Sequence, residues 1–436
     1  MIRTKLWTLA GLCLLGTVAC QELVPTSVDD DLLPPAPVTV EVRLGWDAFG
    51  SGLQVLGGYG APQELGSGVT ARLFAGTLNA RTLARFTGFP QAATVQDSAG
   101  NTRADSALTF VGGWVVARVD TLSSVADGPV TLRLGALQQA WHARTATWEL
   151  AVDTINDRAS WGEAGGGPVV DLGEAVWDPA AGDSVRFPVD SAQVAAWADT
   201  LDLTRGVRLD AVTEGARLRI TNVFLRLDTR SSLAPDTTLV LTAPRRDLTF
   251  VYDPLPDPPP DGLRVGGAPS WRSVMDISVP ATLSGPPSLC TVGCPFALTA
   301  DRLNYAALVL RTRASSPAFQ PTDTVTLDLR PVLLRSALPK APLGSSLTAS
   351  LGRRVAPDLF GSRPGAEIEI PLTQFVRDLL RGETATGTDP PNTLALLTTF
   401  EPLSIAFASF WGPGSGADLE PVLKLIVTAG PSVQLP

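Results

Sequence analysis

The sequence contains little of the chemistry on which most enzymes rely. It has one histidine, His142, in 436 residues, so a Ser-His-acid or Cys-His arrangement would have a single candidate base. It has no GxxxxGK[ST] segment for phosphate and no HExxH segment for zinc. His142 lies in a polar turn, where an ordinary exposed side chain is the simpler explanation. We therefore predict no catalytic centre.

Glu367 and Glu369 come closest to a paired acid. They lie two residues apart on an expected strand and share one face, with Ile368 and Ile370 on the other. A glycosidase needs two carboxyl groups that face each other across about 5 to 9.5 Å. We expect a solvated strand face here.

Lysine is also scarce, with three in the whole chain, and the formal net charge is −9. The loss of Arg3 and Lys5 with an N-terminal leader would bring the charge from −9 to −11. Nucleic-acid binding depends on clustered Lys and Arg that neutralise phosphates. The sequence therefore predicts no nucleic-acid partner.

The four cysteines exclude an ordinary zinc site. Cys13 lies in the leader, Cys20 ends it, and Cys290 and Cys294 have no second Cys pair or His cluster to complete a metal site. In an exported protein this pair is expected to form a local disulfide, with free thiols as the alternative. Asp29 to Asp31 offer the only hint of structural calcium, but consecutive carboxylates on a tether rarely converge. We predict no metal and no cofactor.

The N-terminus predicts export. Arg3 and Lys5 precede an apolar run from Leu6 to Ala19, which is too short to span a bilayer but suits a signal peptide. The run ends in Thr17-Val18-Ala19-Cys20, which resembles the lipobox of bacterial lipoproteins. The resemblance implies a signal peptide over residues 1–19, a lipid on Cys20, and an outer-membrane or cell-surface location because Gln21 follows. A plain secreted protein or an uncleaved anchor is the alternative. Residues 20–37 are acidic and rich in proline, as a flexible tether would be.

The rest of the chain has the composition of an all-β protein. It has 40 Gly, 37 Pro and 44% hydrophobic residues, enough for sizeable cores. Alternating segments such as Val38–Val42 and Val130–Leu134 predict strands, and the Gly-rich segment 51–68 predicts a loop. Two short helices are expected, over Asp190–Trp197 with a cap at Asp190 or Ser191 and over Thr373–Arg381. Many short strands between Gly and Pro turns favour β-sandwiches.

Features of the first half recur in order in the second, which indicates one fold used twice. Arg72–Phe86 aligns with Leu263–Ile277 without a gap, including Arg81 with Arg272. The recurrence places two tandem β-sandwich domains over residues 38–243 and 244–436, each with one short helix. Residues 253–261, DPLPDPPPD, have the composition of an interdomain linker, but the recurrence makes them a loop inside the second domain. Four further correspondences support the alignment: Asp105–Val111 with Asn304–Arg311, Val130–Leu134 with Thr324–Leu329, Val185–Val189 with Glu367–Leu372, and Asn222–Leu227 with Pro421–Val427.

Residues 131–148 carry a family resemblance. An alternating strand leads to Trp141, and Thr147-Trp148 follows, which together with the flanking segments resembles DNRLRE-type domains. The resemblance covers about residues 38–243 and more weakly 244–429, where the tryptophan pair is missing. It implies a jelly-roll β-sandwich found on secreted and surface bacterial proteins, some of which bind polysaccharide. The GGYG and LGSG segments at 57–60 and 65–68 also resemble uncharacterised surface lipoproteins.

Tryptophans are the best binding candidates in the sequence. An exposed indole offers a sugar a flat apolar face and a polar handle. The candidates are Trp141, Trp148, Trp161, Trp177 and Trp411. We therefore predict a non-catalytic surface lipoprotein that binds glycan or envelope polymer. A structural or assembly protein that docks with envelope proteins is the alternative, and an extracellular polysaccharide-active enzyme is third.

Overall fold

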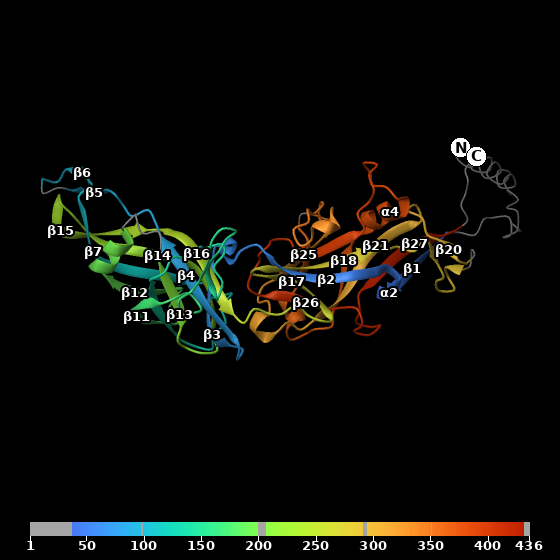
Figure 1. Cartoon of the computed structure of the whole chain (residues 1–436), viewed down its shortest axis with the longest axis horizontal. Helices are drawn as coiled ribbons and strands as arrows, with labels where there is room; N and C mark the ends of the chain where they lie inside the picture. The colour runs from blue at the N-terminus through green and yellow to red at the C-terminus, as the bar shows by residue number, and fades with distance from the viewer. Residues whose placement is uncertain (1–36, 97–98, 199–205, 291–293, 350, 431–436) are drawn as a thin grey trace, which may run out of the picture.

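The computed structural model describes residues 37–96, 99–198, 206–290, 294–349 and 351–430. The expected signal peptide, Cys20 and nearly all of the tether lie outside the described residues. The chain is all-β, as predicted, and forms two lobes side by side along the long axis of the molecule (Figure 1). We define the first lobe as residues 68–253 and the second lobe as residues 38–59 together with 262–429.

The first lobe is built around one large antiparallel sheet in the order β11-β8-β13-β4-β3-β14-β7-β12, with β15 beside β14 and β16 beside β4. Its strands are β3 Gly68–Phe74, β4 Leu78–Phe86, β5 Ala93–Gln96, β6 Thr102–Asp105, β7 Leu108–Val119, β8 Val130–Leu137, β9 Leu150–Asp153, β10 Arg158–Ser160, β11 Val169–Trp177, β12 Ser184–Asp190, β13 Val207–Ala211, β14 Arg217–Ser231, β15 Ala234–Ala243 and β16 Arg245–Asp253.

The second lobe has the order β1-β27-β21-β26-β17-β18-β25-β22-β23, with β2 beside β18 and β24 beside β21. Its strands are β1 Val38–Gly45, β2 Gly50–Tyr59, β17 Gly262–Gly267, β18 Ser270–Ile277, β19 Thr282–Leu283, β20 Phe296–Ala297, β21 Leu303–Arg313, β22 Val325–Pro331, β23 Arg353–Val355, β24 Glu367–Pro371, β25 Thr393–Thr398, β26 Phe407–Trp411 and β27 Val422–Ala429.

The two sheets repeat one strand arrangement. The run β8-β13-β4-β3 of the first lobe has its counterpart in β22-β25-β18-β17 of the second, and β7 with β12 corresponds to β21 with β24. The single long strand β14 corresponds to β26 and β27 together, because β14 pairs with both β3 and β7 while β26 pairs with β17 and β27 with β21. The expected recurrence therefore matches the topology.

The division of the chain differs from the expected boundary at Ala243. β1 pairs with β27 and β2 pairs with β18, so the first strands of the chain complete the second lobe. Their blue ribbons lie among the orange and red strands in Figure 1. Conversely β16, expected to open the second domain, pairs with β4 from Asn79 to Phe86. The physical reason is local: β15 pairs with β14 across a short turn at Ser232 and Leu233, at little loop-closure cost, and β16 follows β15 after Pro244 alone, so it joins the same sheet beside β4.

Two local predictions change as a consequence. Residues 254–261 connect the first lobe to the second, as their linker composition predicts. The interpretation from the recurrence, a loop inside the second domain, is wrong here. The predicted loop over 51–68 is wrong, because Gly50–Tyr59 forms β2. Its glycines fit where rings approach the backbone: a Cβ on Gly50 would lie 2.6 Å from the ring of Trp46, and one on Gly57 3.1 Å from Trp271.

Helices are few and short. Among the described residues they are α2 Trp46–Phe49, α3 Ser191–Ala198 and α4 Thr373–Arg381, with 3-10 turns at Pro62–Leu65, Pro317–Phe319, Arg335–Ala337 and Pro357–Phe360. The two predicted helices are confirmed, and Asp190 accepts a hydrogen bond from the Gln193 amide at 2.8 Å, as a helix N-cap does. Among the described residues, no helix is long and apolar enough to cross a membrane.

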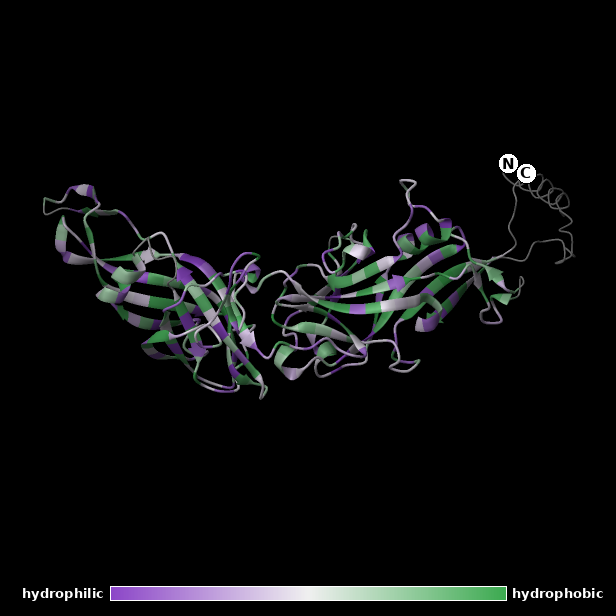
Figure 2. Cartoon of the chain, viewed as in Figure 1, coloured by the Kyte–Doolittle hydropathy of each residue, from purple (hydrophilic) through white to green (hydrophobic). Residues whose placement is uncertain are grey.

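Each lobe has its own apolar core, formed by alternate residues of the strands (Figure 2). In β1, Val40 and Val42 are buried in the second-lobe core while Glu41 is exposed. A third apolar cluster joins the lobes: Val69, Leu78, Phe250 and Tyr252 of the first meet Ala268, Phe319, Ile405 and Phe407 of the second. The lobes are therefore packed against each other over an apolar contact.

Candidate functional site

The tryptophan-rich segment 138–168 covers the outer face of the first-lobe sheet. Trp141 and Trp161 are 4% and 6% exposed, and with Leu137 they form a small core against Leu83 of β4 and Val251 of β16. Trp148 is half-buried at the edge of this core. The segment is therefore held to the sheet by its own aromatic side chains.

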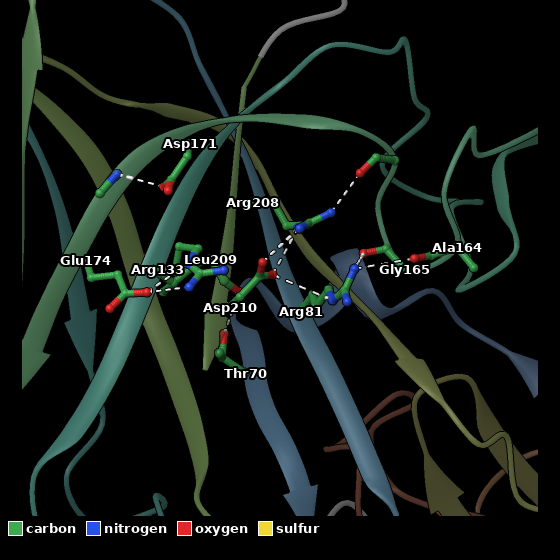
Figure 3. A network of polar contacts seen from close by, with 12 residues as sticks. Thr70, Arg81, Arg133, Ala164, Gly165, Asp171, Glu174, Arg208, Leu209 and Asp210 are labelled. Carbon is green, nitrogen blue, oxygen red and sulfur yellow. Dashed lines mark hydrogen bonds and ion pairs between the residues drawn. The ribbon is translucent and has the colours of Figure 1, made fainter. Parts of the chain in front are cut away.

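Three arginines of the sheet fix the same segment in place, and two of them, Arg81 and Arg208, are seen in Figure 3. Arg81 lies over the Trp148 ring at 4.9 Å and donates to the Gly165 carbonyl at 2.9 Å. Arg85 lies over the Trp141 ring at 4.5 Å and donates to the Trp141 carbonyl at 2.8 Å. Arg208 donates to the Gly167 carbonyl at 2.7 Å. We call Arg81, Arg85 and Arg208 the arginine clamp.

Two aspartates offset the positive charge of the arginine clamp. Arg208 pairs with Asp210 through Nε at 2.9 Å and Nη2 at 2.8 Å, and Arg85 pairs with Asp247 at 3.3 Å. Burial lowers the pKa of Arg81 and of Arg85, and the nearby carboxylates oppose that shift. Charged groups buried with partners fix geometry more than they add stability. The clamp therefore holds residues 138–168 as a fixed cover over the sheet.

The structure does not present the five candidate tryptophans as an exposed binding surface. Trp141 and Trp161 are buried in the cover, and Trp177, 2% exposed, lies in the first-lobe core. Trp411 is half-buried beneath Arg313, whose guanidinium lies 4.5 Å from the ring centre. Trp148 is the candidate that lines a pocket. The reason is physical: an indole buries more apolar area inside a β-sandwich than almost any other side chain.

His142 and the cysteine pair have local roles. His142 is exposed, and its Nδ1 lies 3.1 Å from the Thr145 hydroxyl. Cys290 and Cys294 form a disulfide with Cα atoms 4.9 Å apart. Within the described residues, no group of three or more His, Cys, Asp or Glu side chains could hold a metal ion.

A spacious candidate site lies on the outer face of the second lobe. We call it the outer cleft; its volume is about 660 Å³, within the range of ligand sites in proteins. Strand alternation puts Ile368 and Ile370 of β24 in the core and directs Glu367 and Glu369 to the cleft. The other lining residues come from β21, from the end of β24, and from β23 with the segment before it: Tyr305, Pro371, Arg353, Leu347, Thr348, Ala349 and Gly352.

Ion pairs hold the two glutamates. Glu367 accepts hydrogen bonds from Arg43 at 2.7 Å and Arg311 at 3.2 Å. Glu369 accepts from Lys424 at 2.8 Å and lies 3.5 Å from the Tyr305 hydroxyl. Burial and the charge of Glu369 raise the pKa of Tyr305, so its hydroxyl remains a donor. Arg353 is exposed and has no acidic partner among the described residues.

A buried carboxylate fixes the wall opposite the glutamates. Asp328 is 1% exposed and accepts hydrogen bonds from the Ser346 hydroxyl at 2.6 Å and the Thr348 hydroxyl at 2.7 Å. The Ser346 hydroxyl oxygen also lies 3.1 Å from the Ala349 carbonyl oxygen. Both walls of the cleft are thus pre-organised, which lowers the entropic cost of binding.

Sequence reasoning placed the two glutamates on one polar face but missed the cleft. Tyr305, Thr348 and Arg353 reach it from segments far away in the sequence. The available signal was that Glu41 and Arg43 share the polar face of β1. This face predicts charged partners for Glu367 and Glu369 only once β1 is assigned to the second lobe.

No protein-family model, no curated protein and no solved structure matches the chain. The DNRLRE-type resemblance therefore remains a hypothesis based on the residues alone.

Proposed function

We propose that the protein is an exported surface lipoprotein, anchored through Cys20, that binds glycan or envelope polymer without catalysis. The observation that supports the binding role is the outer cleft, with its carboxylates, an aromatic ring and the exposed guanidinium of Arg353 around one pre-organised space. Carboxylates and hydroxyls accept and donate the hydrogen bonds that sugar hydroxyls need. Arg353 adds a preference for glycans that carry carboxylates, which arginine can bind in a bidentate way.

The arrangement of the acids supports a non-catalytic role. Glu367 and Glu369 project from one strand to the same side, whereas hydrolysis of a glycosidic bond needs carboxyl groups on opposite sides of that bond. Both glutamates already form ion pairs with basic side chains, Glu367 with Arg43 and Glu369 with Lys424. The polysaccharide-active enzyme is therefore the weakest of the three hypotheses.

The proposed anchor sets the orientation of the molecule. The start of β1 pairs with the end of β27, so a tether before residue 38 joins the second lobe and not the first. A lipid on Cys20 would hold the second lobe nearer the membrane and leave the first lobe farther out.

The binding proposal can be tested on a glycan array with the soluble chain, residues 21–436. We expect wild type to bind one class of acidic polysaccharide, and Glu369→Gln and Tyr305→Phe to weaken that binding about tenfold, as the loss of charge-assisted hydrogen bonds does. Glu174→Gln is the matched control, because Glu174 pairs with Arg133 on the first lobe, outside the cleft. If folded Glu369→Gln binds as wild type does, the cleft is not the site.

A structural role is the second candidate. Its support is the burial of Trp141, Trp161 and Trp177 together with the apolar cluster between the lobes, in which Phe319 stacks on Phe407 at 5.3 Å. Such a molecule suits a spacer or a docking platform for envelope proteins. Absence of binding to every glycan on the array would favour it.

A further inference from the structure

A second pocket lies where the two lobes meet. We call it the junction pocket; its volume is about 220 Å³. Trp148, Arg144 and Asp153 of the tryptophan-rich region line it together with Phe250 and Tyr252 of β16, and Pro269 closes it from the second lobe. Ligand pockets often form at junctions of this kind, with apolar walls and a few polar groups.

Tyr252 is the feature that points to a ligand. Its side chain is 5% exposed, and its ring packs against Phe250 and Phe319 with centres 5.9 and 6.0 Å away. No hydrogen bond within the described residues involves its hydroxyl, and the hydroxyl oxygen is not among the fully buried polar atoms without a partner, so it is accessible to a ligand in the pocket that Tyr252 lines. Burial raises the pKa of Tyr252, which keeps the hydroxyl protonated and able to donate.

The other lining groups limit the kind of ligand. Arg144 pairs with Glu64 at 2.6 Å, and Asp153 lies 3.5 Å from Arg158, so each charge at the rim already has an opposite one. A neutral ligand therefore fits better than an ion. The pocket is smaller than the roughly 300 to 1,000 Å³ of drug-sized sites, so it suits a single ring. The half-buried indole of Trp148 offers that ring an apolar surface.

We propose that the junction pocket binds one neutral pyranose residue, with an apolar face of the sugar against Trp148 and a sugar hydroxyl bonded to the Tyr252 hydroxyl. This site goes beyond the proposed function, because the outer cleft shares no lining residue with it. A terminal sugar of a longer glycan and a free monosaccharide present the same ring to it.

The test is saturation-transfer NMR and calorimetry on residues 21–436 with methyl glucopyranoside, galactopyranoside and mannopyranoside, and with glucuronate as the charged comparison. We expect at least one neutral methyl glycoside to bind better than glucuronate. Tyr252→Phe keeps the ring and removes only the hydroxyl, so it should weaken binding about threefold to tenfold. Trp148→Ala should abolish binding. Tyr59→Phe is the matched control, because its hydroxyl donates to the Pro339 carbonyl at 2.7 Å and does not line the pocket.

Three results would overturn the proposal: no binding of any neutral methyl glycoside, tighter binding of glucuronate, or unchanged binding in folded Tyr252→Phe. The last result keeps its meaning even if Trp148→Ala fails to fold. None of these results bears on polysaccharide binding at the outer cleft, which Glu369→Gln tests separately.

Discussion

The substitution Phe49→Ala should destabilise the second lobe, although the whole first lobe follows Phe49 in the sequence. Phe49 is 1% exposed in α2, between β1 and β2, and its ring meets that of Trp46 edge to face at 5.5 Å. Both residues belong to the second-lobe core. Truncation of a buried phenylalanine costs about 3 to 5 kcal/mol, against a total of about 5 to 15 kcal/mol for a typical domain.

Hydrogen exchange read by mass spectrometry resolves the effect by segment. We expect amides of 38–59 and 262–429 to lose about 3 to 5 kcal/mol of protection in Phe49→Ala, with a smaller loss in 68–253 that passes through the contact between the lobes. Phe187→Ala is the matched control, since Phe187 is fully buried in β12 of the first lobe and should give the opposite pattern. A loss confined to 68–253 in Phe49→Ala would refute the strand pairing described above.

Two smaller predictions concern local structure. Asp105 accepts hydrogen bonds from the Ser231 and Ser232 hydroxyls and from the amides of Ala107 and Leu233, which hold its pKa well below the ordinary value; its stabilising effect is therefore present above about pH 4 and lost as the pH falls below that value. The protection factors of amides in the turn between β14 and β15, which correct for the slower intrinsic exchange in acid, should fall from pH 7 to pH 3 for wild type and be low already at pH 7 for Asp105→Asn. Equal protection factors of wild type at pH 3 and pH 7 would contradict this. The Cys290–Cys294 disulfide closes a short loop, so replacing both cysteines with serine should cost no more than about 2 kcal/mol in urea unfolding; a loss well above that would give the bridge a larger structural role.

The elements that sequence reasoning located correctly depend on nearby residues. The helix over Thr373–Arg381 follows from local pattern, and α3 from the cap at Asp190. The buried face of β1 follows from the alternation of Val40 and Val42. The loop predicted over 51–68 is wrong, because the glycines favour a loop only locally. Pairing with Arg272 to Ile277, more than 200 residues away, makes much of this segment a strand.

The tryptophans show why the site was harder to predict than the fold. Composition shows that an indole is present but not which side of a sheet it covers. Arg81, Leu83 and Arg85 carry a usable signal, because they share one face of β4 and mix two cations with a leucine. The arginines of such a face require carbonyl acceptors, and its leucine requires apolar contacts. The segment with Trp141 and Trp148 provides both.

The strand order explains why the chain crosses between the lobes twice. In the first lobe a further strand pairs with β4, and in the second lobe a further strand pairs with β18. The strand beside β4 is β16, which follows β15 directly in the sequence. The strand beside β18 is β2, from the start of the chain. Residues 60–67 and 254–261 therefore both connect one lobe with the other. Gly60 and Leu255, one from each connection, line the junction pocket. The pocket is thus built where the two connections pass, and a change in either connection should alter ligand binding there before it alters the core of either lobe.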